Sequence, residues 1–250
     1  MSPSQHQLCH VIWSPATDGE DVRALLTEAE RERYRQFHEA ADRARFVTGR
    51  ALTRATMSRF LGVPPDRLEF SRTCRRCGGP HGKPEVPGAS VDFSLSHSGE
   101  HVLLAVAEHV EVGVDVERTS GQNSDRLAAR VLSATERSRF AAVAPGRRDH
   151  AFRVYWTRKE ALLKSVGQGV LSAMEEITVS DAEEQAELVA WGARTDVSRF
   201  ELTDLRAPSG YVAALAVHGG RRIRREESRL SHPLDVEDFV FHRGAQGTTA

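Results

Sequence analysis

Two carboxylates stand two residues apart in the segment Gly113-Val-Asp-Val-Glu-Arg118, where Asp115 and Glu117 alternate with valines. On a β-strand, side chains two apart share a face, so the pattern predicts that both carboxylates project together while the valines face the core. Such a pair suits Mg²⁺, which takes a few protein oxygens and completes its octahedron with waters and substrate phosphates. A solvated strand end without a metal would show the same pattern, so the segment alone leaves both interpretations open.

The segment Trp156-Thr-Arg-Lys-Glu-Ala-Leu-Leu-Lys164 predicts a helix with its apolar residues buried on one side. Glu160 and Lys164 are four residues apart and therefore share a face, where they could also form an ordinary surface ion pair. If Glu160 joins a metal held by Asp115 and Glu117, and Lys164 meets a phosphate one turn further on, these residues make a phosphoryl-transfer site.

Lysine is rare in this chain. It occurs only at Lys83, Lys159 and Lys164, and the other 31 of the 34 basic residues are arginine. Because lysine is a compact point charge and arginine a planar fork, the three lysines mark positions that need a point charge, unless they are chance survivors in an arginine-rich chain. Lys83 lies in Gly82-Lys-Pro84, a turn suited to presenting a cation to a phosphate.

A strand and a helix must bring these residues together, and the rest of the chain shows both patterns. In chain order, the predicted elements are a helix over residues 21–60, a stop at 62–65, a short strand at 68–70, a hairpin of 93–97 and 102–107, and a strand at 112–116. Ser96 and His97 are adjacent on the hairpin and should point to opposite faces, which argues against a nucleophile and base of a serine hydrolase.

The order of elements repeats in the second half of the chain. Residues 102–107 resemble residues 212–217 at an offset of 110, and the same offset aligns the helix around Arg50 with the helix around Glu160. Two such units predict an α+β fold of two pseudo-twofold-related repeats, with a cleft between them. We expect residues 1–118 to form the N-terminal repeat, 119–220 the C-terminal repeat, and 221–250 a peripheral extension. Alternatively, the two halves resemble each other by coincidence, because segments rich in alanine and valine match one another easily.

Composition limits the class of protein. The chain has 250 residues, 40% of them apolar, and a net charge of -1, without the basic excess typical of non-specific nucleic-acid binding. The first 13 residues lack a signal-peptide pattern, and no apolar run is long enough to span a membrane. Three cysteines in a chain of this length indicate a reducing compartment. These features predict a cytoplasmic protein with no nucleic-acid or membrane partner.

Four segments resemble the motifs of Sfp-type 4′-phosphopantetheinyl transferases, in matching order. They are Gly82-Lys-Pro84, Ser94-Leu-Ser-His-Ser98, Gly113-Val-Asp-Val-Glu117 and the segment from Trp156 to Lys164, and the resemblance spans about Arg31 to Val217. It implies transfer of the 4′-phosphopantetheine group of coenzyme A to a serine of an acyl or peptidyl carrier protein, with release of adenosine 3′,5′-bisphosphate. The family's monomeric members resemble tandem duplications with the active site in the cleft between the halves, so the resemblance also implies that location of the active site and a monomer.

Site residues follow from the same resemblance, motif by motif. Asp115, Glu117 and Glu160 would hold Mg²⁺ against the diphosphate of coenzyme A, and Lys164 would contact that diphosphate. The other expected coenzyme A contacts are Lys83, Ser96 and His97 on phosphates, and Arg45, Arg50 and the weaker candidate Arg33 near the nucleotide and its 3′-phosphate. Glu160 would deprotonate the acceptor serine, while Lys164 would offset charge on the leaving phosphate.

Carrier proteins of this kind are typically acidic and helical. Such a carrier could contact Arg126, Leu127, Arg130 and Val131, although an amphipathic core helix with solvated arginines fits the same residues.

Two other activities would use similar side chains. A Mg²⁺-dependent phosphohydrolase would also need three carboxylates and lysines, and a non-catalytic coenzyme A or carrier-binding module would be favoured only by an incomplete carboxylate set.

Cys74-Arg-Arg-Cys77 followed by His81 has the spacing of zinc ligands and lies directly before Lys83. Zinc needs a fourth ligand, and the chain contains no second pair of cysteines at this spacing. Cys9, His10 or another histidine could supply it, and two loop thiols without metal are the alternative.

Overall fold

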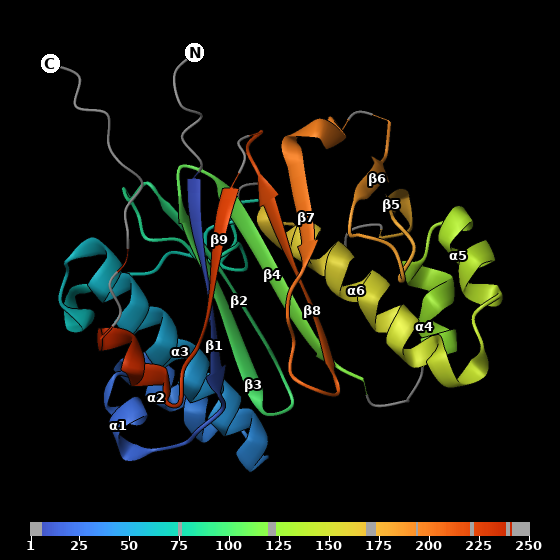
Figure 1. Ribbon diagram of the computed structural model, residues 1–250. Helices are drawn as coiled ribbons and strands as arrows, with labels where there is room; N and C mark the ends of the chain where they lie inside the picture. Colours follow the sequence, from blue (N-terminus) through green and yellow to red (C-terminus); the bar gives the residue numbers. More distant parts are fainter. Residues whose placement is uncertain are drawn as a thin grey trace, which may run out of the picture. The chain divides into compact units, whose positions relative to one another are not determined.

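The structure is a computed structural model that describes residues 7–74, 77–119, 124–168, 174–193, 195–220, 223–238 and 241. The chain is a mixed α+β protein, as predicted, and it divides into two compact units (Figure 1). Unit 1 comprises Met1–Ser71, Glu85–His109 and Arg222–Ala250, and unit 2 comprises Arg72–Pro84 and Val110–Arg221. Among the described residues, no helix has both the length and the apolar character needed to cross a membrane.

Unit 1 is built on a four-stranded sheet in the order β2-β3-β1-β9. Its strands are β1 (Gln7–Pro15), β2 (Val91–Ser98), β3 (His101–Glu108) and β9 (Ile223–Arg229). β1 pairs antiparallel with β3 and parallel with β9. The long helix α3 (Ala40–Leu61) packs on this sheet, and its buried residues share a core with the strands. The predicted hairpin is confirmed as β2 and β3.

The helical pattern predicted over residues 21–60 forms three helices, namely α1 (Glu20–Ala24), α2 (Glu28–Arg35) and α3. The division has a local cause, because Thr27 and Glu30 form a capping box that begins a new helix at α2. Gly62 ends α3 in the left-handed conformation at φ 71°, which confirms the predicted stop. The short 3-10 helices of this unit are Pro65–Arg67 and Pro233–Asp238.

The predicted strand at residues 68–70 is wrong. The backbone is irregular there, and the Leu68 carbonyl accepts a hydrogen bond from the Arg54 side chain at 2.9 Å. Among the neighbouring residues that the structure describes, the only strand-like pairing is an isolated bridge between Ser71 and Glu85. A three-residue stretch with a charged central residue is too short to specify a strand when a buried arginine binds the carbonyl of its first residue.

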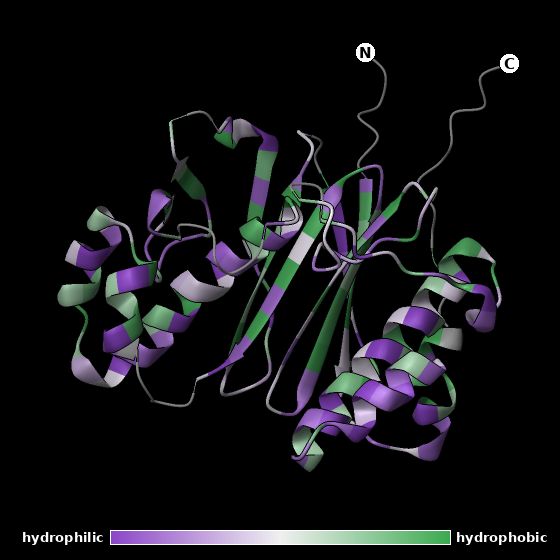
Figure 2. Ribbon diagram, turned by 180° about the vertical axis from the view of Figure 1, so that it is seen from behind, coloured by the Kyte–Doolittle hydropathy of each residue, from purple (hydrophilic) through white to green (hydrophobic). Residues whose placement is uncertain are grey.

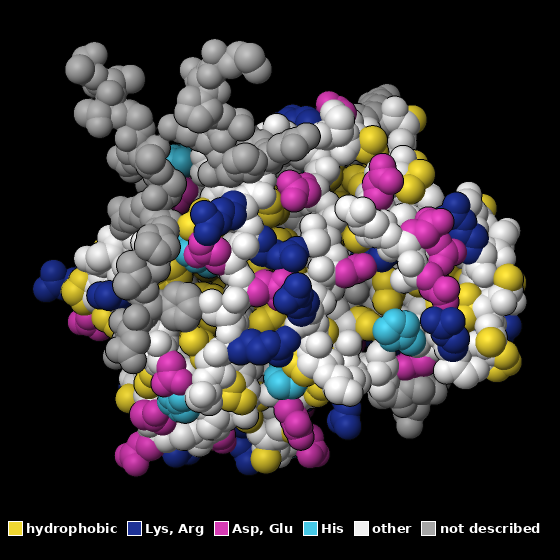
Figure 3. Space-filling model, in the orientation of Figure 1, with side chains coloured by type: hydrophobic (Ala, Val, Ile, Leu, Met, Phe, Trp, Pro, Cys, Tyr) yellow, Lys and Arg dark blue, Asp and Glu magenta, His cyan; other side chains and the backbone are white. Residues whose placement is uncertain are grey.

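The C-terminal segment differs from the expected peripheral extension, since β9 is an edge strand of the unit 1 sheet. Figure 3 shows basic and acidic side chains interspersed over the face that carries β9. On this strand Arg224 pairs with Glu226 at 3.3 Å and Arg225 with Glu227 at 3.0 Å. Charged side chains on an edge strand discourage pairing with another chain. The predicted apolar stretch at residues 239–241 lies largely outside the described residues.

Unit 2 contains an antiparallel sheet in the order β4-β8-β7, formed by β4 (Glu111–Arg118), β8 (Tyr211–His218) and β7 (Phe200–Asp204). The helix α6 (Arg148–Ser165) packs on β4 and β8. The remaining elements are α4 (Ser124–Val131), α5 (Ala134–Ala141), the pair β5 (Ile177–Val179) and β6 (Leu188–Trp191), and the 3-10 helices Pro145–Arg147, Met174–Glu176 and Val197–Arg199. Figure 2 shows hydrophobic residues gathered in the strands, while the helices mix both kinds.

The predicted repeat appears in the element bounds. β3 covers 101–108 and β8 covers 211–218, an offset of 110 at both ends, and each unit lays one long helix on its sheet. The units divide between His109 and Val110, whereas the sequence placed the boundary after residue 118. The difference arises because β4 pairs with β8 in register from Glu111 to Arg118. The expected cleft between repeats stays a prediction.

A buried ion pair ties α6 to the other helices of unit 2. Lys159 and Glu136 have 0% exposed side chains, and their charged atoms lie 2.5 Å apart. Lys159 also donates to the carbonyls of Val131 at 2.7 Å and Met174 at 3.1 Å, so three acceptors meet its three donors. The position of Lys159 therefore requires a compact charge, as the rarity of lysine suggested, but this charge pairs with Glu136 inside the core.

We expect Lys159→Arg to lower the free energy of unfolding by about 2–4 kcal/mol, because a planar fork cannot fill this compact, fully buried site. Urea unfolding measures the effect. Lys164→Arg is the matched control for stability, since Lys164 lies on the same helix with 28% of its side chain exposed. Equal stability of the two variants would contradict a packing requirement at Lys159.

Candidate functional site

The strand β4 carries Asp115 and Glu117, and it is buried more deeply than the sequence suggested. Val114 and Val116 are fully buried, as expected for the core face. Asp115 is also buried, with only 4% exposed, whereas an exposed strand end was expected. The reason is that α6 packs along β4 and covers the carboxylate. Glu117, nearer the end of the strand, is half-buried.

Gly113 explains how α6 comes so close to the strand. A Cβ atom at this position would lie 1.9 Å from the carbonyl oxygen of Ala161 and 2.4 Å from the backbone nitrogen of Ser165. Both atoms belong to the helix backbone, which cannot rotate away as a side chain can. Only glycine therefore permits this contact, and the contact sets the distance between the β4 carboxylates and the side chains of α6.

One face of α6 carries the matching charges. Lys164 donates to the Asp115 Oδ1 atom at 2.6 Å and to the carbonyl of Val114 at 3.2 Å. Two turns before Glu160, Arg153 lies 3.5 Å from the Glu117 carboxylate. Residues 153, 160 and 164 follow a spacing of seven and four, so they share one helical face. Asp115 and Lys164 thus meet within unit 2, and Glu160 lies near enough for their charges to affect its pKa.

Glu160 is the most perturbed carboxyl group of this cluster. Burial raises its pKa from the ordinary 4.5 to about 7; the charges of Asp115 and Glu117 add to the increase, and Lys164 opposes it. Its Oε1 atom is buried and accepts no hydrogen bond from any described residue. A buried oxygen without a donor, close to two further carboxylates, is a chemical environment that a divalent cation would satisfy.

Lys83 approaches the same strand from the loop before β2. Its Nζ atom donates to the carbonyl of Val112 at 2.6 Å, two residues before the carbonyl that Lys164 contacts. Carbonyls two residues apart point to the same edge of a strand, so the two lysines line one edge of β4. All three lysines of the chain therefore lie in unit 2 and donate to backbone carbonyls.

The other predicted site residues belong to unit 1. Ser96 is buried and His97 exposed, which fits the expectation that they point to opposite faces of β2. Arg45 forms an ion pair with Asp42 and donates to the carbonyl of Gly99 at 2.9 Å.

Two further arginines of unit 1 were candidates near the nucleotide. Arg50 pairs with Glu30 at 3.7 Å and lies over the Phe46 ring. Arg33 is exposed and stacks over Phe37. The Arg50 guanidinium group is thus held by residues of α2 and α3, and that of Arg33 by a residue just after α2.

The sequence analysis did not identify Arg153, which pairs with Glu117. The signal that could have identified it is its spacing of seven residues from Glu160.

The candidate carrier contacts on α4 differ in burial. Arg126 and Arg130 are exposed, whereas Val131 is buried in the core of unit 2. This burial fits an amphipathic core helix with solvated arginines, and contact of the two arginines with a carrier stays a prediction.

Two family profiles match the chain on either side of the division between the units. The profile described as 4′-phosphopantetheinyl transferase, N-terminal, matches residues 11–109, and the profile of the 4′-phosphopantetheinyl transferase superfamily matches residues 111–216. The 4′-phosphopantetheinyl transferase HetI of a Nostoc species is 30% identical over 211 residues, which cover 82% of this chain and 84% of the relative.

The chain belongs to the 4′-phosphopantetheinyl transferase superfamily. A 4′-phosphopantetheinyl transferase of Bacillus subtilis is 29% identical over 66% of this chain and 71% of its own. Among solved structures, a Thermotoga maritima holo-[acyl-carrier-protein] synthase gives a TM-score of 0.36 at 20% identity, over 46% of this chain and 64% of its own. The protein is therefore an enzyme that transfers phosphopantetheine from coenzyme A to carrier proteins. The phosphohydrolase and binding-module alternatives are not favoured.

In this transferase, the perturbed Glu160 predicts a pH-dependent stability of the metal-free protein. Glu160 binds its proton more tightly in the folded chain, so the free energy of unfolding should fall as the pH rises from 4.5 through about 7. Glu160→Gln should therefore raise metal-free stability by about 3 kcal/mol at pH 8 and by little near pH 4.5. Urea unfolding in chelator at the two pH values measures this. A gain that is equal at both would contradict the assignment.

Proposed function

We propose that this transferase is of the Sfp type and that Asp115, Glu117 and Glu160 bind the Mg²⁺ ion on which it depends. The carboxylates of Asp115 and Glu117 on β4 act on the pKa of Glu160 on α6, and the three groups supply hard oxygen ligands, which Mg²⁺ prefers. The observation that carries the proposal is the buried Glu160 Oε1 atom, which accepts no hydrogen bond from the described residues. When bound, the ion would neutralise negative charge on the diphosphate of coenzyme A.

Lysine charges support the same assignment. Lys164 has 28% of its side chain exposed, and its Nζ atom contacts a metal-ligand candidate, Asp115. An ammonium group in this position can exchange one anionic partner for another, so it suits contact with a diphosphate oxygen and with charge that develops on the leaving phosphate. We assign Lys83 to a second phosphate contact, because it lines the same edge of β4.

The proposal includes residues of unit 1 as coenzyme A contacts. Arg45 and Arg50 carry planar guanidinium groups, which suit bidentate contacts with a terminal phosphate such as the 3′-phosphate. Ser96 and His97 offer a hydroxyl group and an imidazole to phosphate oxygens. Each can be tested alone, by the change in the KM for coenzyme A after Arg45→Ala, Arg50→Ala or His97→Ala.

The chemical step needs a base and no enzyme nucleophile. The serine hydroxyl of the carrier attacks the β-phosphorus of coenzyme A, a phosphoester bond forms, and the phosphoanhydride bond to adenosine 3′,5′-bisphosphate breaks. We propose that a carboxylate oxygen of Glu160 takes the serine proton, because burial and the charges of Asp115 and Glu117 raise the pKa of Glu160 to about 7, which suits a general base. The base role is wrong if Glu160→Gln loses Mg²⁺ affinity but keeps the pH profile of turnover.

The direct test is mass spectrometry of an apo carrier domain incubated with the enzyme, coenzyme A and Mg²⁺. The expected result is a mass gain of one phosphopantetheine group, with Mg²⁺ removed by chelator as the negative control. Mg²⁺ binding is measured separately by calorimetry, so metal affinity has a readout that does not depend on turnover. No mass gain on fatty-acid, polyketide and peptide-synthetase carriers would overturn the proposal.

The acceptor and the cellular setting are also proposals. We propose that the physiological carriers belong to polyketide or nonribosomal peptide biosynthesis, which comparison of kcat/KM across purified carrier domains would test. The sparse and odd number of cysteines supports a reducing compartment such as the cytoplasm. A monomer is expected because one chain contains both repeats, and sedimentation would measure it.

A further inference from the structure

The loop that precedes Lys83 has almost no hydrophobic support. Within the described residues from Arg72 to Pro84, only Gly82 is buried. The loop closes on itself through backbone hydrogen bonds, from Gly82 to the carbonyl of Arg72 at 2.7 Å and from Cys74 to the carbonyl of Gly79 at 2.8 Å. Because a small closed loop without a core gains little from packing, such loops commonly depend on a disulfide or a metal for rigidity.

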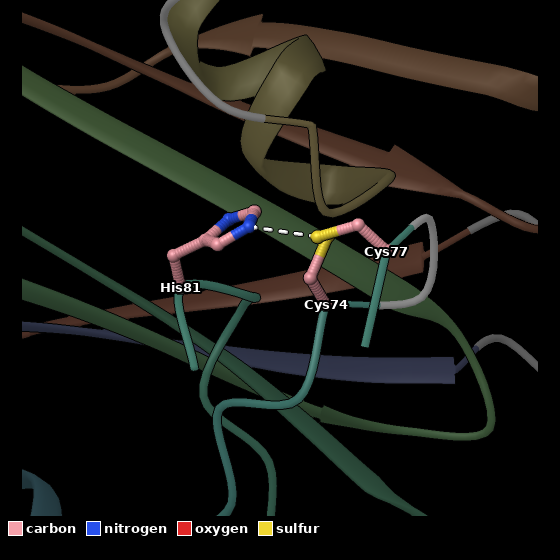
Figure 4. A group of neighbouring side chains, drawn as sticks. All are labelled: Cys74, Cys77 and His81. Atoms are coloured by element: carbon pink, nitrogen blue, oxygen red, sulfur yellow. Dashed lines mark hydrogen bonds between the residues drawn. The ribbon is translucent and has the colours of Figure 1, made fainter. Parts of the chain in front are cut away.

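Three ligand atoms converge inside this loop. Figure 4 shows the side chains of Cys74, Cys77 and His81 pointing toward one another. Their ligand atoms all lie within 4.8 Å of one another, and the Cys77 Sγ and His81 Nε2 atoms are 3.0 Å apart. A tetrahedral zinc ion needs sulfur atoms about 3.8 Å apart and sulfur to nitrogen distances of about 3.6 Å. Among the described residues, this is the one group of three or more candidate ligands with such proximity.

We propose that Cys74, Cys77 and His81 bind one Zn²⁺ ion, which holds the loop in its closed form. Thiolate and imidazole are the ligands that zinc prefers, whereas Mg²⁺ takes oxygen, so this site is chemically distinct from the carboxylate cluster. The ligand set balances the charge of the ion, because the two negative charges of the thiolates, with a neutral imidazole, offset the two positive charges of Zn²⁺.

The fourth ligand of the zinc ion is a water molecule. The candidates in the sequence were Cys9, His10 or another histidine. Cys9 and His10 lie on β1 and are buried in unit 1, at 0% and 2% exposed, and no other described histidine, cysteine or carboxylate joins the group. The ring of His10 packs edge-on against Phe60 and Phe241 within that core. Neither side chain can leave its core without a large cost, so a water molecule completes the tetrahedron. Three protein ligands at a surface loop imply an ion that a strong chelator removes.

The ion would also position Lys83, two residues after His81. A Cβ atom at Gly82 would lie 2.5 Å from the carbonyl oxygen of Thr73, so the two sides of the loop are in backbone contact at that point. Fixing Cys74 and His81 to one ion therefore restrains the turn from which Lys83 reaches Val112. Zinc binding itself does not depend on the proposed transferase mechanism.

Metal analysis of untagged protein, purified without added zinc, tests the proposal. We expect about one zinc ion per chain in the wild type, and at least about a tenfold lower content in Cys77→Ser and His81→Asn, because two ligands hold zinc poorly. His150→Asn is the matched control, since this exposed histidine lies on α6, away from the loop. Zinc far below one per chain in the wild type would overturn the proposal.

A second measurement uses the wild type alone, so it does not depend on the folding of any variant. After chelation, cobalt should bind with the charge-transfer bands of thiolate ligation, and hydrogen exchange at the amides of Cys74 and Gly82 should be faster in the metal-free protein. Absence of thiolate bands would overturn the ligand set. A disulfide between Cys74 and Cys77, seen as a mass lower by two hydrogens, would overturn it as well. Unchanged exchange would overturn the structural role.

Discussion

Asp115→Ala should reduce phosphopantetheine transfer at least about 1,000-fold, equivalent to about 4 kcal/mol of transition-state stabilisation. The carboxylate is 4% exposed, accepts from Lys164 at 2.6 Å and raises the pKa of Glu160 through its charge. Its loss would remove a proposed Mg²⁺ ligand and leave Lys164 without its carboxylate partner. The rate of carrier modification, followed by mass spectrometry, gives the activity, and calorimetry gives the Mg²⁺ affinity.

Glu111→Ala is the matched control for this substitution. Glu111 lies on the same strand, four residues before Asp115, and pairs with His218 at 2.7 Å. Loss of the Glu111 side chain should change the rate of transfer by less than about threefold. The partly exposed pair with His218 contributes little, and Glu111 lies outside the carboxylate cluster. The assignment of Asp115 fails if Asp115→Ala retains transfer within tenfold of the wild type with the same dependence on Mg²⁺.

Gly113→Ala should damage both stability and activity. The added Cβ atom would lie 1.9 Å from the Ala161 carbonyl oxygen, so α6 must move away from β4. Overpacking of this kind costs about 1–3 kcal/mol, and a displacement of about 1 Å between catalytic groups can reduce turnover about 100-fold. Urea unfolding and the transfer assay, performed on the folded fraction, measure the two effects separately.

Gly146→Ala provides the comparison, because a Cβ atom there would have no neighbour within 4 Å. Its stability and turnover should match those of the wild type, apart from the small effect of reduced backbone freedom. If Gly113→Ala behaves like Gly146→Ala, the close contact between β4 and α6 does not set the geometry of the site.

Several features of the fold could be predicted from local sequence. The hairpin of β2 and β3, the strand β4 and the helix α6 each have a strong apolar pattern, and Gly62 is a typical helix end. The strand β9 could not be found in this way, because its sequence is dominated by charged residues. Its place in the sheet depends on parallel pairing with β1, a contact between the two ends of the chain.

The amino-acid sequence by itself determined which chemical groups are present and which of them share a face. The spacing of Asp115 and Glu117 on a strand, and of Glu160 and Lys164 on a helix, follows from local periodicity. Only the tertiary structure decided that Asp115 is buried, that Lys159 serves Glu136 instead of a ligand, and that Arg153 holds Glu117. The physical reason is that the contacts of Asp115 and Arg153 depend on how closely α6 approaches β4, and that of Lys159 on how α5 packs against α6. Packing over the whole core of unit 2 fixes that distance, and a glycine permits it.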